Sequence, residues 1–302
     1  MSGFLKLKNI TGKVDIFNTQ LTNLSFLSNL EKISGERSQE GSHLSIHDNP
    51  NLKKLGWDSL KTLFPMSSGF MLHISRNHPD FCLSTQEKQF FAKKGVQLLE
   101  SDDLPICIDA IRKDGQKECF FWNLENLGTD CQHLIGDVVV DNTNEKFAWR
   151  LANVTTIYGS LTIRDTQELV DLDFLGNLEA MIKSKNAERT VIRILSNKKL
   201  QKVVMLKMRK PPFPYDYDED YIQIDKNSME LFKTAKQCVV IQAITQTRVQ
   251  YNGKSCTKLP RAPDSDHNGE EEEEEDEEPG SSNISRSQLQ HILTFAIIIL
   301  LF

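Results

Sequence analysis

The residues best suited to chemistry are six cysteines and a few histidines, and their spacing favours a structural role over catalysis. No two cysteines form a CxxC pair, so neither a zinc ribbon nor a thioredoxin-like redox site is indicated. The sequence also has no GxSxG, HExxH, glycine-rich phosphate loop or glycine-rich dinucleotide fingerprint. We therefore expect a protein that is not an enzyme and that uses no cofactor.

Four histidines are the remaining metal-ligand candidates, namely His43, His47, His73 and His78. They flank two predicted strands, in which polar residues alternate with buried apolar ones. We interpret them as solvent-facing residues and expect no metal site. Cys238, which precedes two valines, is interpreted as half of a disulfide and not as a nucleophile.

A long internal repeat organises the elements that carry these residues. Residues 12–31 and 159–179 are identical at eleven of twenty aligned positions, with one extra residue in the second copy. The similarity continues between residues 43–55 and 192–203. A repeat of this length indicates a duplicated domain.

A shorter period lies inside each copy, in the form of apolar–x–apolar pairs that are typical of strands with one buried face. A strand every 20–30 residues or so is the spacing of stacked coils that share one parallel sheet, so we predict a solenoid; the alternative is two ordinary α/β domains. The pairs are Val14/Ile16, Leu44/Ile46 and Leu72/Ile74, then Val138/Val140, Leu161/Ile163, Ile192/Ile194 and Ile222/Ile224.

These residues resemble the receptor L-domain, the ligand-binding module of the insulin and epidermal growth factor receptors, and more closely the nematode proteins that pair L-domains without a kinase. The shared pattern is G-x-hydrophobic-x-I, x-T-x-x-L and L-x-F-L-x-N-L-E, followed by a strand ending in x-N-x-x-L. It runs here from Gly159 to Glu179 and from Ile192 to Leu200. The resemblance covers roughly residues 4–256 and implies a right-handed β-helix-like fold for each copy.

The resulting fold-class prediction is an α/β solenoid of two right-handed, leucine-rich-like L-domains in tandem. Because the first copy has no counterpart of the Val138/Val140 strand, we expect it to be truncated at its start. The predicted domains are residues 1–115 and 116–258, followed by an acidic stalk and spacer (259–291) and a hydrophobic tail (292–302).

The six cysteines allow fifteen disulfide patterns. The repeat reduces the number of plausible patterns. One pair of cysteines follows the last predicted strand of each copy, and the third pair precedes the first strand of the second copy. The resemblance implies one bridge near the start of an L-domain and one near its end. We therefore favour Cys82–Cys107, Cys119–Cys131 and Cys238–Cys256; the alternative is free thiols in a cytosolic protein.

Sequons support an extracellular setting. Asn9, Asn23 and Asn153 each begin an N-x-S/T triplet and are predicted N-glycosylation sites. The start of the chain lacks the apolar core of a signal peptide, which we attribute to the same truncation.

The other end of the chain resembles a lipid-anchor signal. Gly280, Ser281 and Ser282 form a small-residue site, followed by a polar spacer and an eleven-residue terminal segment that is apolar except for Thr294. This order is typical of glycosylphosphatidylinositol attachment, and a tail retained in the membrane is the alternative. We expect the outer leaflet of the plasma membrane as the location.

Charge argues against nucleic acid as a partner. The net charge is −6, and the run 270–278 alone carries nine acids, so the rest of the chain is only about +3. The acidic run cannot bury apolar surface and is interpreted as an extended stalk.

An aromatic insertion offers candidate ligand contacts among acidic residues, at Phe213, Tyr215, Tyr217 and Tyr221. The function we predict is a non-catalytic, membrane-attached binding protein for an extracellular protein or peptide. The resemblance implies an insulin-like or growth-factor-like peptide, which the protein would sequester or present as a co-receptor. The alternatives are a structural or adhesion protein without a peptide ligand and a cytosolic scaffold.

Overall fold

The computed structural model describes most of the chain up to Leu259. The described residues are 2–35, 41–57, 59–64, 69–99, 104–107, 112, 114–182, 190–203, 205, 207–208, 222–232, 235–245 and 247–259.

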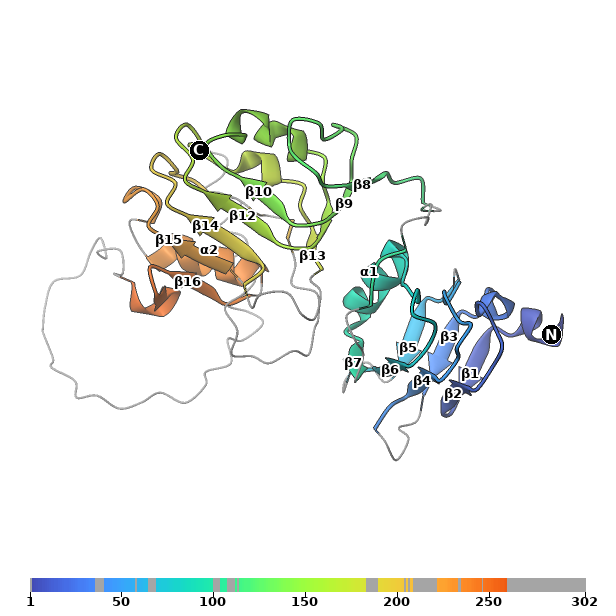
Figure 1. The fold of residues 1–302 in the computed structure, drawn as a ribbon. Helices are drawn as coiled ribbons and strands as arrows, with labels where there is room; N and C mark the ends of the chain where they lie inside the picture. Colours follow the sequence, from blue (N-terminus) through green and yellow to red (C-terminus); the bar gives the residue numbers. More distant parts are fainter. Residues whose placement is uncertain are drawn as a thin grey trace, which may run out of the picture.

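Two small parallel sheets form the first unit (Figure 1). One has the order β2-β4-β6-β7 and the other β1-β3-β5. Helix α1 follows β6, and the short 3-10 turns η1 and η2 flank the first strands. The bounds are η1 Ser2–Lys6, β1 Asn9–Thr11, β2 Val14–Phe17, η2 Ser25–Leu27, β3 Lys32–Ser34, β4 Leu44–His47, β5 Thr62–Phe64, β6 Met71–Ser75, α1 Thr85–Lys94 and β7 Gln97–Leu99.

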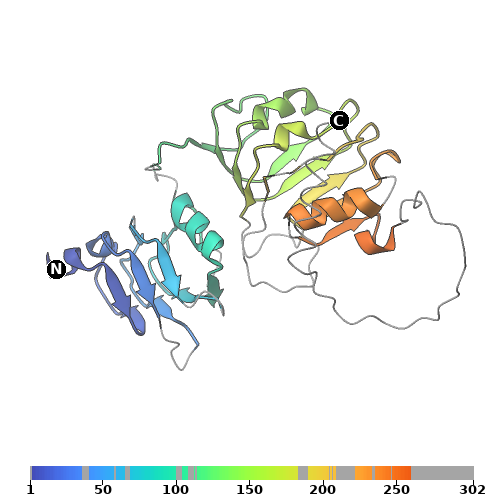
Figure 2. The same cartoon turned by 180° about the vertical axis from the view of Figure 1, so that it is seen from behind.

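The second unit repeats this plan with larger sheets. Their orders are β10-β12-β14-β15-β16-β17 and β13-β11-β9-β8, and α2 lies along β16 (Figure 1, Figure 2). The bounds are β8 Glu118–Phe120, β9 His133–Ile135, β10 Val138–Val140, η3 Glu145–Leu151, β11 Thr156–Tyr158, β12 Leu161–Arg164, η4 Asp173–Leu175, β13 Ala180–Met181, β14 Ile192–Leu195, β15 Ile222–Asp225, α2 Ala235–Thr245, β16 Val249–Tyr251, β17 Lys254–Ser255 and η5 Cys256–Lys258.

The predicted strand pairing is confirmed. Val14 pairs with Leu44 and Leu44 with Leu72 in one parallel sheet. Leu161, Ile192 and Ile222 are aligned in the same way in the second unit. The apolar partners of each pair face inward, and they build two main cores, one between Leu24 and Val96 and one between Leu124 and Cys256.

The prediction of a solenoid of right-handed β-helix-like coils is wrong. The described strands form four separate sheets of three, six, four and four strands and do not join into a closed coil. Between the sheets, the chain makes 3-10 turns and isolated single bridges such as Asn23–Lys54 and Asp171–Lys202. A regular sequence period fixes the spacing of the strands along the chain. It does not require the segments between those strands to pair with one another and close each coil.

Buried asparagines close the strand ends. The Asn197 amide is fully buried and donates from Nδ2 to the Ile163 carbonyl at 3.0 Å and to Asn227 Oδ1 at 2.8 Å. Its Oδ1 accepts from the backbone and hydroxyl of Thr166 at 3.2 and 2.8 Å. Asn49 does the same in the first unit, with Thr19 as donor and Ile16 as acceptor, as its x-N-x-x-L position in the repeat predicts.

Three disulfides reinforce the ends of the units. They join Cys82–Cys107, Cys119–Cys131 and Cys238–Cys256, with Cα atoms 5.1, 5.9 and 5.4 Å apart. These are the pairs that the repeat and the resemblance favour. Cys238 lies on α2 and Cys256 on η5, so this bond ties the last helix to the segment after the last hairpin.

We expect Asn197→Ala to lower the free energy of unfolding by roughly 2–3 kcal/mol, because it leaves buried backbone groups at Ile163 and Thr166 without a partner. Urea unfolding followed by circular dichroism measures this change. The matched control is Asn126→Ala, an exposed asparagine, which should change the same quantity by less than about 0.5 kcal/mol. Equal effects of the two substitutions would contradict a structural role of the buried amide.

Candidate functional site

The outer face of the β2-β4-β6-β7 sheet carries an aromatic ladder, which we define as Phe17, His47 and His73. The rings of Phe17 and His47 stack with centroids 5.5 Å apart and planes 5° apart. The rings of His47 and His73 follow at 5.6 Å and 26°. Since alternate residues of these strands point into the core, the ladder faces away from it, and Phe17 remains 50% exposed.

Charged groups fix the central ring of the ladder. His47 Nδ1 lies 2.7 Å from Asp48 Oδ2, and His47 Nε2 lies 3.2 Å from Asp15 Oδ1. Arg76 donates from Nε and Nη2 to both Asp48 oxygens at 2.7 and 2.8 Å. The hydrogen bond from Arg76, assisted by the one from His47, holds the pKa of Asp48 well below its usual range. The site therefore combines an exposed ring with both signs of charge.

At the described positions of the second unit that match the ladder, the residues are different. The position that matches Phe17 in the repeat is Arg164, and its parallel partner is Leu195 in place of His47. Neighbouring outward positions on β14 and β15 carry Arg193 and Gln223. Equivalent strands of the two units therefore carry different outward side chains, and the aromatic ladder lies on the first unit.

A second cluster lies where α1 meets the β13-β11-β9-β8 sheet, and we call it the junction (Thr85, Arg112, Glu118, His133 and Tyr158). The Arg112 side chain is only 3% exposed and donates to Asp114 Oδ1 and Oδ2 at 3.1 and 2.5 Å. It also donates to Thr85 Oγ1 at 3.3 Å and to Gln89 Oε1 at 3.1 Å, both on α1. The Thr85 hydroxyl donates in turn to Glu118 on β8.

Apolar contact completes the junction. The Tyr158 hydroxyl donates to the Thr85 carbonyl at 3.1 Å, and its ring packs with Ala92 of α1 and with Ile182. Burial raises the pKa of Tyr158 well above its usual value. Polar and apolar contacts thus join the two units through α1 and β11.

His133 is the titratable group at the centre of the junction. It is fully buried; Nε2 lies 2.6 Å from Gln116 Oε1, and Nδ1 lies 3.4 Å from the Tyr158 hydroxyl. Burial lowers the pKa of His133 to about 4, and the nearby Arg112 charge acts in the same direction, whereas Asp114 opposes it. The imidazole is therefore neutral at physiological pH.

The other sequence-derived sites fall in different places. Of the three sequon residues, Asn9 and Asn153 are exposed and Asn23 is half-buried, and Asn153 Nδ2 donates to the Thr129 carbonyl at 2.7 Å. The aromatic insertion and the small-residue site lie outside the described residues: Phe213, Tyr215, Tyr217, Tyr221, Gly280, Ser281 and Ser282.

Sequence reasoning took His43, His47 and His73 to be solvent-facing, but His43 is buried and its Nδ1 accepts from the Met71 N–H. It did not single out Phe17, Arg76 or Arg112. The alternation of each strand predicts that side chains such as Phe17 face outward, but it does not show which residues of neighbouring strands stack. In the described part of the chain, no group of three or more His, Cys, Asp or Glu side chains could hold a metal ion. No described helix is long and apolar enough to span a bilayer.

Comparison with known proteins identifies the fold family. The family described as receptor L domain matches residues 1–94 and 130–211, which together make up more than half of the chain. The chain belongs to the receptor L domain family. Members are non-catalytic ligand-binding modules of receptor-like proteins and are generally extracellular or at the cell surface.

One curated relative is protein irld-34 of Caenorhabditis elegans, with 29% identity over 185 residues. The matched segment is 56% of this chain and 45% of irld-34. The matched segment therefore spans less than half the length of this relative.

Acidification should weaken the fold through His133. A free histidine has a pKa of 6.5, so as the pH falls the unfolded chain binds this proton before the folded chain does. The stabilisation is complete above about pH 6.5 and is lost progressively towards about pH 4. We expect the melting temperature to fall between pH 7 and pH 5, and His133→Gln to reduce this dependence.

Thermal unfolding by circular dichroism at several pH values measures this effect. The control is His78→Gln, which replaces a histidine outside the junction and should keep the dependence of the wild type. Equal pH dependence in the wild type and in His133→Gln would contradict this role.

Proposed function

We propose that this protein is an extracellular receptor-like binding protein that captures a protein or peptide ligand on the outer face of the β2-β4-β6-β7 sheet. The observation that carries the proposal is the ladder, in which a half-exposed phenylalanine is stacked on histidines beside ionised groups. The three disulfides support an oxidising compartment.

The shape of this surface favours a macromolecular ligand. A sheet face offers an extended surface, whereas small-molecule sites are concave and bury most of their ligand. Aromatic residues are enriched among the anchors of protein interfaces. Phe17 is such an anchor, and the stack on His47 restricts its motion, which lowers the entropy lost on binding.

The charges around the ladder set the chemistry of the ligand. Arg76 is about two-thirds exposed even though it binds Asp48, and Asp15 is one-quarter exposed beside it. A ligand that places an apolar side chain on Phe17 and charged groups nearby would match this pattern. The class that we propose is an insulin-like or growth-factor-like peptide, which the protein sequesters or presents as a co-receptor.

Phe17→Ala should weaken binding of such a peptide at least about tenfold, because it removes the exposed anchor of the ladder. Surface plasmon resonance with a panel of insulin-like and growth-factor-like peptides measures the affinity. Melting temperature should change little, because the side chain is half-exposed.

The matched control is Met229→Ala, which truncates a side chain that is 90% exposed in the second unit. It should leave the affinity unchanged. Equal affinity of Phe17→Ala and wild type would move the site elsewhere, with the insertion of Phe213, Tyr215, Tyr217 and Tyr221 as the next surface to test. Failure of the whole panel to bind would favour an adhesion or structural role.

We also propose attachment to the outer leaflet through a lipid added at Gly280, Ser281 or Ser282. The order of small site, polar spacer and short apolar tail supports this. In cells that express the chain behind a functional signal peptide, phosphatidylinositol-specific phospholipase C should release the protein into the medium. Protein that stays on the membrane, with residues 292–302 detected by mass spectrometry, would indicate a tail that is not cleaved.

A further inference from the structure

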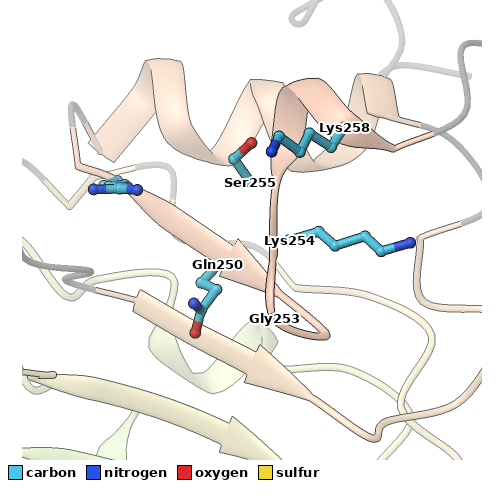
Figure 3. A pocket seen from close by; sticks show the side chains of 6 residues that line it. Gln250, Gly253, Lys254, Ser255 and Lys258 are labelled. Atoms are coloured by element: carbon cyan, nitrogen blue, oxygen red, sulfur yellow. The ribbon is translucent and has the colours of Figure 1, made fainter.

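A basic pocket lies at the end of the second unit, away from the ladder of the first. It has a volume of about 460 Å³ and lies beside the hairpin of β16 and β17, with η5 forming part of its wall (Figure 3). Its lining residues are Arg248, Gln250, Gly253, Lys254, Ser255 and Lys258. Three of these six are cationic and none is acidic, so the pocket favours an anion.

The hairpin and the last disulfide hold this arrangement in place. Tyr251 pairs with Lys254 across the hairpin, and the tight turn between them has left-handed Asn252 and Gly253. Lys258 lies two residues after Cys256, whose disulfide to Cys238 fastens η5 to α2. The hairpin and the disulfide therefore restrict the positions of the lysines that line the pocket.

Among the described residues, the pocket lysines also have no acidic partner. Within the described part of the chain, Lys254 and Lys258 form no ion pair, although other exposed lysines do, such as Lys117 with Asp130 and Lys199 with Glu168. Exposed pairs of this kind contribute little to stability, so their absence costs the fold little. It leaves a local positive potential available to a polyanion.

The same chain supplies a matching polyanion. Residues 270–278 are nine consecutive acids, and eleven residue steps separate Leu259, next to the pocket, from Glu270. Eleven residues span at most about 36–40 Å, so the tether is long enough for the run to reach the pocket. A tethered segment of this kind meets its site at an effective concentration of the order of millimolar.

We propose that the acidic run 270–278 docks in this pocket on Lys254 and Lys258. Nine acids against two lysines leave most carboxylates outside the pocket, so the run can dock in several registers. The interaction is electrostatic and therefore sensitive to salt, because the Debye length shrinks from about 8 Å at 0.15 M to about 3 Å at 1 M. Any external polyanion has to displace the run before it can bind.

Zero-length carbodiimide cross-linking of the full chain, followed by peptide mass spectrometry, tests the contact directly. We expect cross-links from Lys254 and Lys258 to residues 270–278 to be at least about tenfold more abundant than those from two exposed reference lysines, Lys6 and Lys146. The preference should disappear in 1 M NaCl. Cross-links spread evenly over all four lysines would overturn the proposal.

A second measurement separates the tethered run from an external ligand. In a variant with residues 270–278 replaced by glutamine, a sulfated heparin oligosaccharide should bind at least about tenfold more tightly than to the wild type. Lys254→Gln combined with Lys258→Gln should abolish this gain, with folding verified by circular dichroism. Equal heparin affinity of the wild type and the neutralised variant would overturn the proposal and indicate an external polyanion as the occupant.

Discussion

The asparagine amides at the strand ends are the constraint on which the rest of the structure depends. Asn49 and Asn197 are fully buried, and their partners Asn77 and Asn227 are half-buried. Each donates to a carbonyl of the preceding strand, and the amides are hydrogen-bonded to each other in pairs within each unit. A buried polar group without a partner costs about 1–3 kcal/mol, so each amide strongly favours one alignment of its neighbours. This alignment keeps the neighbouring parallel strands in register.

The same constraint builds the candidate binding face. Asp48 and Arg76 immediately precede Asn49 and Asn77 and adopt left-handed conformations, with φ of 55° and 50°. Equivalent turns on neighbouring strands bring these two side chains together, and the resulting ion pair orients His47. In the second unit the corresponding left-handed residues are Ser196 and Lys226, which cannot form such a pair. The same left-handed turn before the asparagine therefore supports a different surface in each unit.

The junction contributes a constraint of another kind, because it links parts of the chain that the repeat does not relate. Arg112 lies between the two copies in the sequence, and its guanidinium donates to Thr85 of α1 in the first unit. Glu118 and Tyr158 of the second unit bond to the same Thr85. A buried polar network is stable only when its members are satisfied together. Protonation of His133 would add a second cation beside Arg112, so acid conditions act on the contact between the units.

Much of this architecture is determined by the sequence itself. Apolar alternation and the internal repeat specify the strands around Val14, Leu44 and Leu72 and their parallel register, because side chains two residues apart share a face. The three cysteine pairs seen in the structure also match those favoured by their positions around the repeat. Only the tertiary structure decided that the sheets stay separate, because a regular sequence period does not require the segments between the strands to pair with one another. Only the tertiary structure, likewise, stacked Phe17 on His47. Stacking between strands depends on exposure and on register across about 30 residues of sequence, which no local pattern encodes.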